Sequence, residues 1–280
     1  MSEPARDSDW EREVNCNLCG GRNHEPLRVD PNWNCTFVRC RSCGLMFYQP
    51  RFSESYVMRR FLGGDGARNE AESLFHKGVL FGEPQGSADE QKRTLQNYYR
   101  FMLGLQTGRY RDINGGGAPD SIFEAGCSVG WYLKVARDEF LVGSKIAQGC
   151  DANRFAAAKA RSGFGLDVFA GTLRDYPLQD WQRNRFHLVA ALDFIEHTYT
   201  PRDDLSKLFD MAAPGGVLML KTFLHELDCQ GSYVHPVFHV HHFTRETLQR
   251  TVGSAGWKIL EFDDQRERSL AQVTVLAHKP

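Results

Sequence analysis

From residue 120 onward, short apolar segments alternate with segments whose apolar residues recur at helical spacing. This alternation predicts an α/β fold in which helices cover both faces of a parallel sheet. Candidate helices begin near Trp131, Asn153, Pro201 and Thr244. The candidate strands are residues 121–125, 145–150, 166–170, 186–192, 216–222, 257–262 and 272–277. Because the last two are close in the chain, we expect a seven-stranded, mostly parallel, doubly wound sheet with an antiparallel last strand.

Length and charge limit the classes of function. The chain has 280 residues, enough for one α/β core and a small additional module. Its formal net charge is −1 and its charged residues are mixed, so nucleic acid is not an expected partner. No segment has the roughly 18 apolar residues that span a bilayer, and the polar first residues lack the apolar stretch of a secretory signal. We therefore expect a cytoplasmic protein without a membrane partner.

Two Cys-x-x-Cys pairs lie near the N-terminus, Cys16 with Cys19 and Cys40 with Cys43. About twenty residues separate the pairs, which is typical of a zinc ribbon, and a glycine directly after each pair gives the turn its backbone freedom. Four thiolates close a tetrahedral shell, so the spacing predicts a structural Zn²⁺ ion in a ribbon module of residues 1–52.

The other cysteines do not form a second pattern of this kind. Cys127, Cys150 and Cys229 are scattered through the later part of the chain, which favours a metal site over a disulfide framework. Cys35 could replace one ligand in a distorted ribbon, but a buried or free thiol is the favoured interpretation.

Residues 53–118 show no strand alternation, and glycine-rich segments such as FGEPQGS and NGGGAPD predict loops. The segment between these two loops has the spacing of an amphipathic helix, with one face formed by Leu95, Tyr98, Tyr99, Met102 and Leu105. Packing of this face in the core is the favoured interpretation. The alternative is a helical lid in which Tyr98 or Tyr99 touches the substrate.

A strand runs into a glycine-containing turn and then a helix in the segment Ile122 to Gly130, IFEAGCSVG. Glycine lets a ligand approach the backbone, and the helix that follows offers free amide groups. Asp151 ends the next strand, where its carboxylate can accept hydrogen bonds from ribose hydroxyls. Together these features predict a nucleoside site. A nicotinamide site is disfavoured, because Ser128 and Trp131 stand where the Gly-x-Gly-x-x-Gly pattern requires glycine.

Several motifs in order, FEAGCSVG, GCDAN, FAGTLRDYP, FHLVAALDFIEHTYTP, APGGVLMLKT and HVHHFTRETLQRTVGSAGW, resemble those of class I S-adenosylmethionine-dependent methyltransferases. The resemblance covers about residues 120–280 and implies a Rossmann-like catalytic domain over residues 119–280. The loops and the helical spacing described above predict a helical lid or linker region over residues 53–118. The resemblance also implies a set of cofactor-binding residues: Glu124, Gly126, Cys127, Ser128 and Gly130 around the methionine part, Asp151 and Ala152 at the ribose, Gly171, Thr172 and Leu173 beside the adenine, and Leu192, Asp193 and Phe194 facing cofactor and acceptor. The family usually has glycine where Ser128 stands.

The cysteine pairs followed by CGLMFYQPR look like the leader of a methyltransferase subgroup tied to surface-polysaccharide or natural-product sugars. This similarity implies a small-molecule or sugar-linked acceptor in a biosynthetic pathway. When the acceptor is a hydroxyl, a base must remove its proton, and histidine suits this role. Candidate bases are His197, after the fourth strand, and His239, after the fifth; packing or helix capping by His197 is the alternative.

Further histidines, His225, His235, His241 and His242, follow the fifth strand, and a metal cluster there is the less favoured alternative to loop packing. In an extended segment His241 and His242 point to opposite faces, so only one of them can reach the site.

Two rival functions use the same features. In a nucleic-acid methyltransferase the ribbon would bind RNA or DNA, but acidic residues around the ribbon offset Arg39, Arg41 and Arg51. In a non-catalytic scaffold the ribbon would bind a protein and the cofactor site would lose its function, an interpretation that the presence of Glu124 and Asp151 disfavours. Oligomeric state and the atom that accepts the methyl group do not follow from the sequence.

Overall fold

A computed structural model describes residues 7–60, 62–77, 86–227, 238–263 and 272–280. Its largest sheet has seven strands in the order β12-β13-β10-β9-β6-β7-β8. Their bounds are β6 Ser121–Ala125, β7 Ile146–Asp151, β8 Asp167–Ala170, β9 Phe186–Leu192, β10 Ala212–Phe223, β12 Lys258–Asp263 and β13 Gln272–His278. Neighbouring strands from β10 to β8 are parallel, and β13 runs antiparallel to both β10 and β12. The predicted mixed sheet with one antiparallel strand is confirmed.

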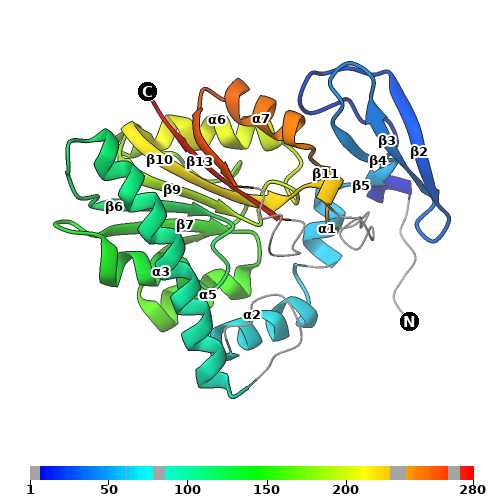
Figure 1. The fold of residues 1–280 in the computed structure, drawn as a ribbon. Helices are drawn as coiled ribbons and strands as arrows, with labels where there is room; N and C mark the ends of the chain where they lie inside the picture. The colour runs from blue at the N-terminus through cyan, green and yellow to red at the C-terminus, as the bar shows by residue number, and fades with distance from the viewer. Residues whose placement is uncertain (1–6, 61, 78–85, 228–237, 264–271) are drawn as a thin grey trace.

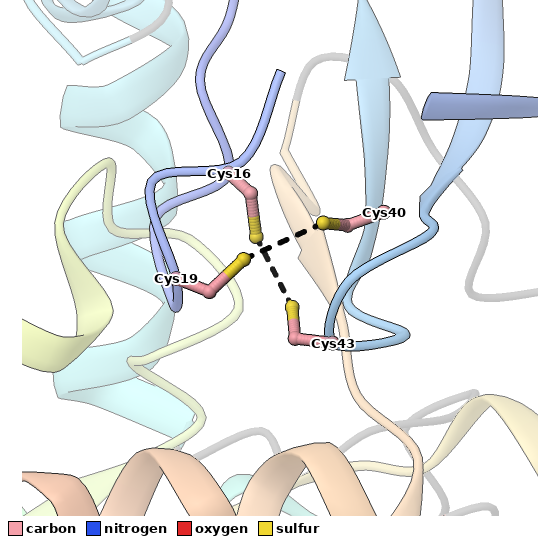
Figure 2. Close-up of side chains that lie close together, drawn as sticks. All are labelled: Cys16, Cys19, Cys40 and Cys43. Atoms are coloured by element: carbon pink, nitrogen blue, oxygen red, sulfur yellow. Dashed lines mark hydrogen bonds between the residues drawn. The ribbon is translucent and has the colours of Figure 1, made fainter. Parts of the chain in front are cut away.

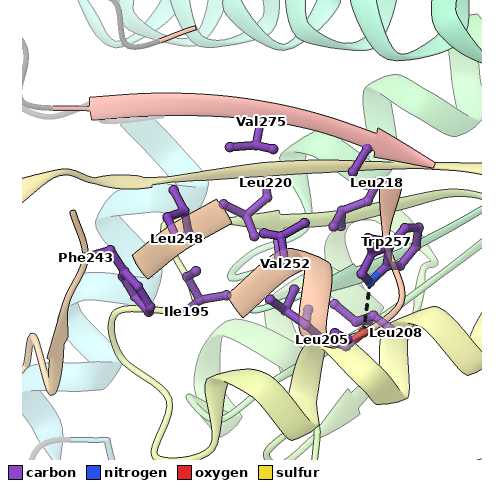
Figure 3. Close-up of a cluster of buried hydrophobic side chains, with 14 of the residues drawn as sticks. Ile195, Leu205, Leu208, Leu218, Leu220, Phe243, Leu248, Val252, Trp257 and Val275 are labelled. Carbon is purple, nitrogen blue, oxygen red and sulfur yellow. Dashed lines mark hydrogen bonds between the residues drawn. The ribbon is translucent and has the colours of Figure 1, made fainter. Parts of the chain in front are cut away.

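Helices cover both faces of this sheet (Figure 1). Their bounds are α3 Ala88–Ile113, α4 Trp131–Val135, α5 Arg154–Phe164, α6 Pro201–Met211 and α7 Arg245–Ser254. Along β10, Val217 and Met219 pack with α3, α4 and α5, whereas Leu218 and Leu220 pack with α6 and α7 (Figure 3). Because successive side chains of a strand point to opposite faces, one apolar run supplies both halves of the core.

The later helices begin where the sequence predicts. Asn153 caps α5 by accepting hydrogen bonds from the backbone amides of Phe155 and Ala156. Thr244 caps α7 in the same way by accepting from the amide of Thr247. A π-helical turn η2 (Ala136–Phe140) follows α4, and short 3₁₀ turns occur at η1 (Asp7–Asp9), η3 (Asp180–Gln182) and η4 (His225–Leu227).

The long helix α3 packs in the core, as favoured, but the predicted apolar face is partly wrong. Leu105 is 40% exposed and Tyr98 and Tyr99 are half-buried. The buried face instead consists of Leu95, Met102, Leu103, Gln106, Thr107 and Tyr110. Counting apolar residues alone missed Gln106, whose side-chain amide donates to the backbone oxygens of Val189 and Val217 at 2.8 and 2.9 Å and so fastens α3 to the sheet.

The N-terminal module is a second sheet that a strand from the C-terminal half of the chain completes. Its strands are β2 His24–Asp30, β3 Cys35–Cys40 and β4 Met46–Gln49, and β11 His241–His242 pairs with β4 in the order β11-β4-β3-β2 (Figure 1). A two-stranded pair of β1 Trp10–Glu11 and β5 Arg51–Phe52 leads to α1 Glu54–Arg60 and α2 Asp65–Lys77. The module and the large sheet share one continuous core. Within the described residues, no helix is long and apolar enough to cross a membrane.

Candidate active site

A cavity of about 350 Å³ lies at the carboxyl ends of β6, β7, β8 and β9. The chain runs outward from β6 to β7 and β8, then returns to β9 on the other side, so the cavity lies where the strand order reverses. Ligands of open α/β sheets bind at this position. The outer wall comes from α1, α2 and the segment between them, through Glu54, Val57, Met58, Leu62, Glu70 and Leu74.

The glycine turn after β6 needs left-handed backbone at three positions. Gly126, Ser128 and Gly130 have φ values of +70°, +50° and +83°. A Cβ at Gly126 would lie 2.9 Å from the Phe194 ring, and a Cβ at Gly130 would lie 2.6 Å from Leu166. A Cβ at either glycine would therefore force a neighbouring side chain to move, and Ser128 holds a conformation that residues other than glycine adopt at a cost of about 1 kcal/mol.

Asp151, at the end of β7, organises the turns around it. Its two carboxylate oxygens accept hydrogen bonds of 2.7 Å from the backbone amides of Ser128 and Asn153. Burial raises the pKa of Asp151 to about 6, although the two amides favour the charged form. The side-chain amide of Asn153 donates a hydrogen bond to the backbone oxygen of Ala67 and so holds α2 over the cavity.

The end of β9 supplies the opposite side of the cavity. Asp193 has φ of +49° and accepts hydrogen bonds of 3.0 and 2.7 Å from the Lys221 ammonium group. Burial alone would lower the pKa of Lys221, but the Asp193 carboxylate raises it above its ordinary value. Phe194 lies against Gly126, which places β9 directly beside the glycine turn.

The two candidate bases lie side by side, but only one of them lines this cavity, and the other borders a second, smaller cavity. His197 lines the cavity, and its ring centroid is 4.9 Å from that of His239. Glu196 lies beside them with 2% exposure and accepts a 2.8 Å hydrogen bond from Thr222. Burial, reinforced by the nearby Asp193 charge, raises the pKa of Glu196 to about 7.

His225, His241 and His242 lie between the ribbon sheet and the large sheet. The β11 residues His241 and His242 are buried, with His241 facing Phe47 and His242 facing Phe37. They border a second cavity of about 10 Å³ together with Glu196, Phe223, Leu224, His225 and His239. Neither β11 histidine lines the large cavity, and His235 lies outside the described residues.

Four cysteine side chains converge at one end of the ribbon sheet (Figure 2). The sulfurs of Cys16 and Cys43 are 3.3 Å apart, those of Cys19 and Cys40 are 3.5 Å apart, and all four lie within 4.8 Å of one another. Tetrahedral bonds of about 2.3 Å to one ion separate sulfurs by about 3.8 Å, so these thiolates fit a metal ion. Cys35 is buried beside Phe37 and Tyr48 and is not part of this group.

A family model described as a methyltransferase domain matches residues 84–261. The chain belongs to the methyltransferase domain family. The predicted enzyme class is confirmed, whereas a search of curated proteins gave no match.

Solved structures show that this methyltransferase has the class I fold. Magnesium protoporphyrin IX methyltransferase from Synechocystis PCC 6803 with bound S-adenosylhomocysteine is 14% identical, with 81% of this chain and 100% of that chain covered and a TM-score of 0.54. The [4+2]-cyclase SpnF is 14% identical over 81% and 94% of the two chains, with a TM-score of 0.55. A chain from the complex of the Haloferax volcanii Trm112 methyltransferase activator with a methyltransferase is 14% identical over 69% and 95%, with a TM-score of 0.53.

The structure brings most of the predicted cofactor-binding residues of the methyltransferase to the cavity wall. These are Gly126, Ser128, Asp151, Ala152, Gly171, Thr172, Leu173, Asp193 and Phe194. Cys127 is a buried residue of the glycine turn, Gly130 packs on α5, and Leu192, the last residue of β9, packs against the core. Glu124 is 4% exposed, does not line the cavity, and has a pKa well above its ordinary value because of burial and the Asp151 charge.

Other cavity residues of the methyltransferase were missed. The helices α1 and α2, which precede the glycine turn in the chain, supply Glu54 and Glu70. Only their distance along the chain from the glycine turn hid them, because a wall formed by a preceding helix leaves no fixed spacing. The proposed contacts of Tyr98 and Tyr99 with substrate are not supported, since neither residue lines the cavity.

Proposed function

We propose that the large cavity binds S-adenosylmethionine and that the enzyme transfers its methyl group to a small-molecule or sugar-linked acceptor in a biosynthetic pathway. The observation that carries this proposal is the convergence of the glycine turn, Asp151 and the end of β9 on one cavity. About 350 Å³ is within the usual range for a small-molecule site. Orientation of the two reactants in such a space supplies much of the rate of a methyl transfer.

The charges of the cavity wall suit the cationic sulfonium. The wall carries the acidic groups Glu54, Glu70, Asp151, Asp193 and Asp204. Among the described lining residues, Arg174 is the only arginine or lysine, and it forms an ion pair with Glu54. An acidic wall attracts a positively charged cofactor and repels a phosphate backbone, which disfavours RNA as the acceptor.

In the proposed complex Asp151 accepts hydrogen bonds from the ribose hydroxyls with lone pairs that Ser128 and Asn153 do not use. The backbone of Gly126 and Ser128 lies along the methionine part, and the segment of Gly171, Thr172 and Leu173 borders the adenine. The residues Glu124, Cys127, Gly130 and Leu192 would support this site from behind the wall.

The reaction itself needs alignment and removal of one proton. For a hydroxyl acceptor, the oxygen loses its proton and attacks the methyl carbon, while the carbon–sulfur bond breaks and its electron pair stays on sulfur. This leaves a methylated acceptor and S-adenosylhomocysteine. His197 lines the cavity and His239 lies directly beside it, and an imidazole at this place can take the proton.

The cysteine cluster has a separate, structural role in this proposal. Zn²⁺ bound by Cys16, Cys19, Cys40 and Cys43 would have no open position for substrate. Its site instead stabilises the ribbon sheet, and β4 of that sheet holds the β11 segment that follows His239. The ribbon therefore supports the acceptor side of the cavity rather than a nucleic-acid surface.

Formation of S-adenosylhomocysteine with a panel of acceptors tests this function. The panel contains nucleotide sugars, small alcohols and total RNA, and Asp193→Asn is compared with Asp180→Asn, which changes an exposed carboxylate outside the cavity wall. We expect the wild type to turn over a small or sugar-linked acceptor. Asp193→Asn should lose most of this activity, whereas Asp180→Asn should keep the activity of the wild type. Methylation of RNA alone contradicts the proposed acceptor class.

A further inference from the structure

Glu196, His197 and His239 bring three potential metal ligands together beside the large cavity. One atom of each, a carboxylate oxygen and two imidazole nitrogens, lies within 4.8 Å of the other two. Glu196 and His197 follow β9, and His239 precedes β11, so two separate loops form the group. The backbone amides of Val240 and His241 donate hydrogen bonds to the backbone carbonyl oxygen of Glu196, which fixes these loops to each other.

The hydrogen bonds of His197 and Glu196 leave one lone-pair atom of each side chain directed toward the other. His197 Nδ1 is 2.7 Å from the Phe238 oxygen, and because a carbonyl only accepts, Nδ1 carries the proton and Nε2 keeps its lone pair. That Nε2 is 4.0 Å from Glu196 Oε1. Glu196 Oε1 is buried and has no hydrogen-bond partner, whereas Oε2 accepts from Thr222. A buried carboxylate oxygen without a partner is costly unless a cation or a proton lies beside it.

The surroundings resemble the outer shell of a metal site. A ligating histidine usually donates its other N–H to a backbone oxygen, as His197 does to Phe238. The small cavity of about 10 Å³, bordered by Glu196 and His239, has room for about one water molecule next to this group. His241, which also borders this cavity, has Nδ1 3.0 Å from the Thr198 oxygen and thereby ties the loop after His239 to the segment after His197.

We propose that Glu196, His197 and His239 bind a divalent transition-metal ion that holds the acceptor oxygen. One carboxylate and two imidazoles suit Mn²⁺, Fe²⁺, Co²⁺ or Zn²⁺, whereas Mg²⁺ and Ca²⁺ prefer oxygen ligands. Metal bonds of about 2.0–2.2 Å place ligand atoms roughly 3.0–3.5 Å apart, so the three side chains must close slightly around the ion.

Three protein ligands leave open coordination positions, unlike the four thiolates of the ribbon. His197 lines the large cavity whereas Glu196 and His239 border the small one, so the ion would lie between the two cavities, with an open position toward the acceptor. A hydroxyl bound to the ion loses its proton to water at a lower pH, so the ion replaces a free histidine in activating the acceptor. This role rests on the proposed methyl transfer; binding of the ion does not.

Cobalt titration of the untagged full chain, with one zinc per chain in the ribbon, tests the site. We expect one further equivalent of Co²⁺, with visible absorption that lacks the thiolate-to-cobalt charge-transfer band. Glu196→Gln and His197→Asn should each weaken this second site at least about 100-fold. The control His225→Asn changes another residue that borders the small cavity and should bind like the wild type. The His197 variant keeps the test decisive if the buried Glu196 variant does not fold.

Absence of a second equivalent in the wild type, or binding by the folded Glu196 and His197 variants at wild-type affinity, overturns the proposal. S-adenosylhomocysteine binding on the same samples separates this result from the proposed function. Cofactor binding without a second metal contradicts the ion alone, and a second metal without cofactor binding contradicts the methyl transfer alone. Full turnover after removal of only the second metal overturns the role of the ion, because a histidine must then remove the proton of the acceptor.

Discussion

The backbone amide of Ser128 donates a hydrogen bond of 2.7 Å to the carboxylate of Asp151, which joins the glycine turn after β6 to the end of β7. The other carboxylate oxygen accepts from Asn153, whose side chain holds α2. One acidic group thus fixes the turn, the helix over the cavity and the proposed ribose position. The ionisation of Asp151 should therefore control cofactor affinity.

Cofactor affinity should fall in acid. The ribose hydroxyls donate to an ionised Asp151, and the pKa of this carboxyl in the folded protein is about 6. Above this pH the affinity should be constant; below it, the Kd should rise about tenfold per pH unit as the carboxylate is protonated. Titration calorimetry with S-adenosylhomocysteine between pH 4.5 and 8 measures this profile, and a Kd independent of pH contradicts it.

Stability of the cofactor-free protein should change with pH in the opposite direction. The folded pKa of Asp151, about 6, lies above its ordinary value of 3.8, so the folded state binds more protons between these two values. The contribution of Asp151 is present below about pH 4 and is lost as the pH rises through about 6, by about 3 kcal/mol. Denaturant unfolding of the wild type and of Asp151→Asn at several pH values measures this contribution as the difference between their unfolding free energies. A difference that does not change between pH 4 and 6 contradicts the raised pKa.

Replacement of Gly130 tests the packing of the glycine turn. Its φ is +83° and a Cβ would lie 2.6 Å from Leu166 and 3.1 Å from Ala160. Gly130→Ala should lower the free energy of unfolding by about 2–4 kcal/mol, from backbone strain together with overpacking. The matched control is Gly165→Ala, with φ of +62° and no atom within 4 Å of its Cβ, which should lose only about 1 kcal/mol. Equal losses in the two variants contradict the packing explanation.

The strands were predictable because each is a continuous apolar run that ends in a polar turn. The segment 186–192 coincides with β9, and the others differ from the structure mainly at their ends. Tertiary pairing was not predictable in the same way. The two residues of β11 join the ribbon sheet through Phe47 and Met46, and a pair this short has no pattern of its own. The division at residues 52 and 118 stays a prediction.

The site was predictable where a strand end fixes a residue, as for Gly126, Asp151 and Asp193. It was not predictable where a polar residue is buried by tertiary contacts. Gln106 and Glu196 are 0% and 2% exposed, yet they read as surface residues in the sequence. Their burial depends on partners 83 and 26 residues away, Val189 and Thr222. Local periodicity contains no information about such partners.

Gln106→Met should weaken the attachment of α3 to the sheet. The amide of Gln106 donates to Val189 and Val217, and its oxygen accepts from the Tyr132 hydroxyl at 2.9 Å. Methionine keeps the volume but leaves these buried groups with fewer partners, which should cost about 2 kcal/mol of unfolding free energy. The exposed Gln179→Met serves as the control in the same denaturant titration. A Gln106 variant as stable as the Gln179 variant contradicts this role.

Loss of one ribbon thiolate should remove the metal and loosen the ribbon. Cys43→Ser should lower bound zinc from about one ion per chain and expose residues 14–50 to protease, because this segment depends on the metal for folding. Cys35→Ser is the matched control: Cys35 is equally buried but lies outside the four-sulfur group, so zinc should be retained. Elemental analysis and limited proteolysis measure both effects. Unchanged zinc in Cys43→Ser contradicts the four-cysteine site.

Binding of S-adenosylhomocysteine to the wild type, Asp151→Asn and Asp180→Asn, measured by titration calorimetry at pH 7.5, tests the cofactor site most directly. Asparagine keeps the shape of Asp151 but removes the charge that accepts the ribose hydroxyls. We expect saturable binding by the wild type and by Asp180→Asn, and at least tenfold weaker binding, about 1.4 kcal/mol, by Asp151→Asn. Equal affinity of all three proteins, or no binding by the folded wild type, contradicts the proposed cofactor site.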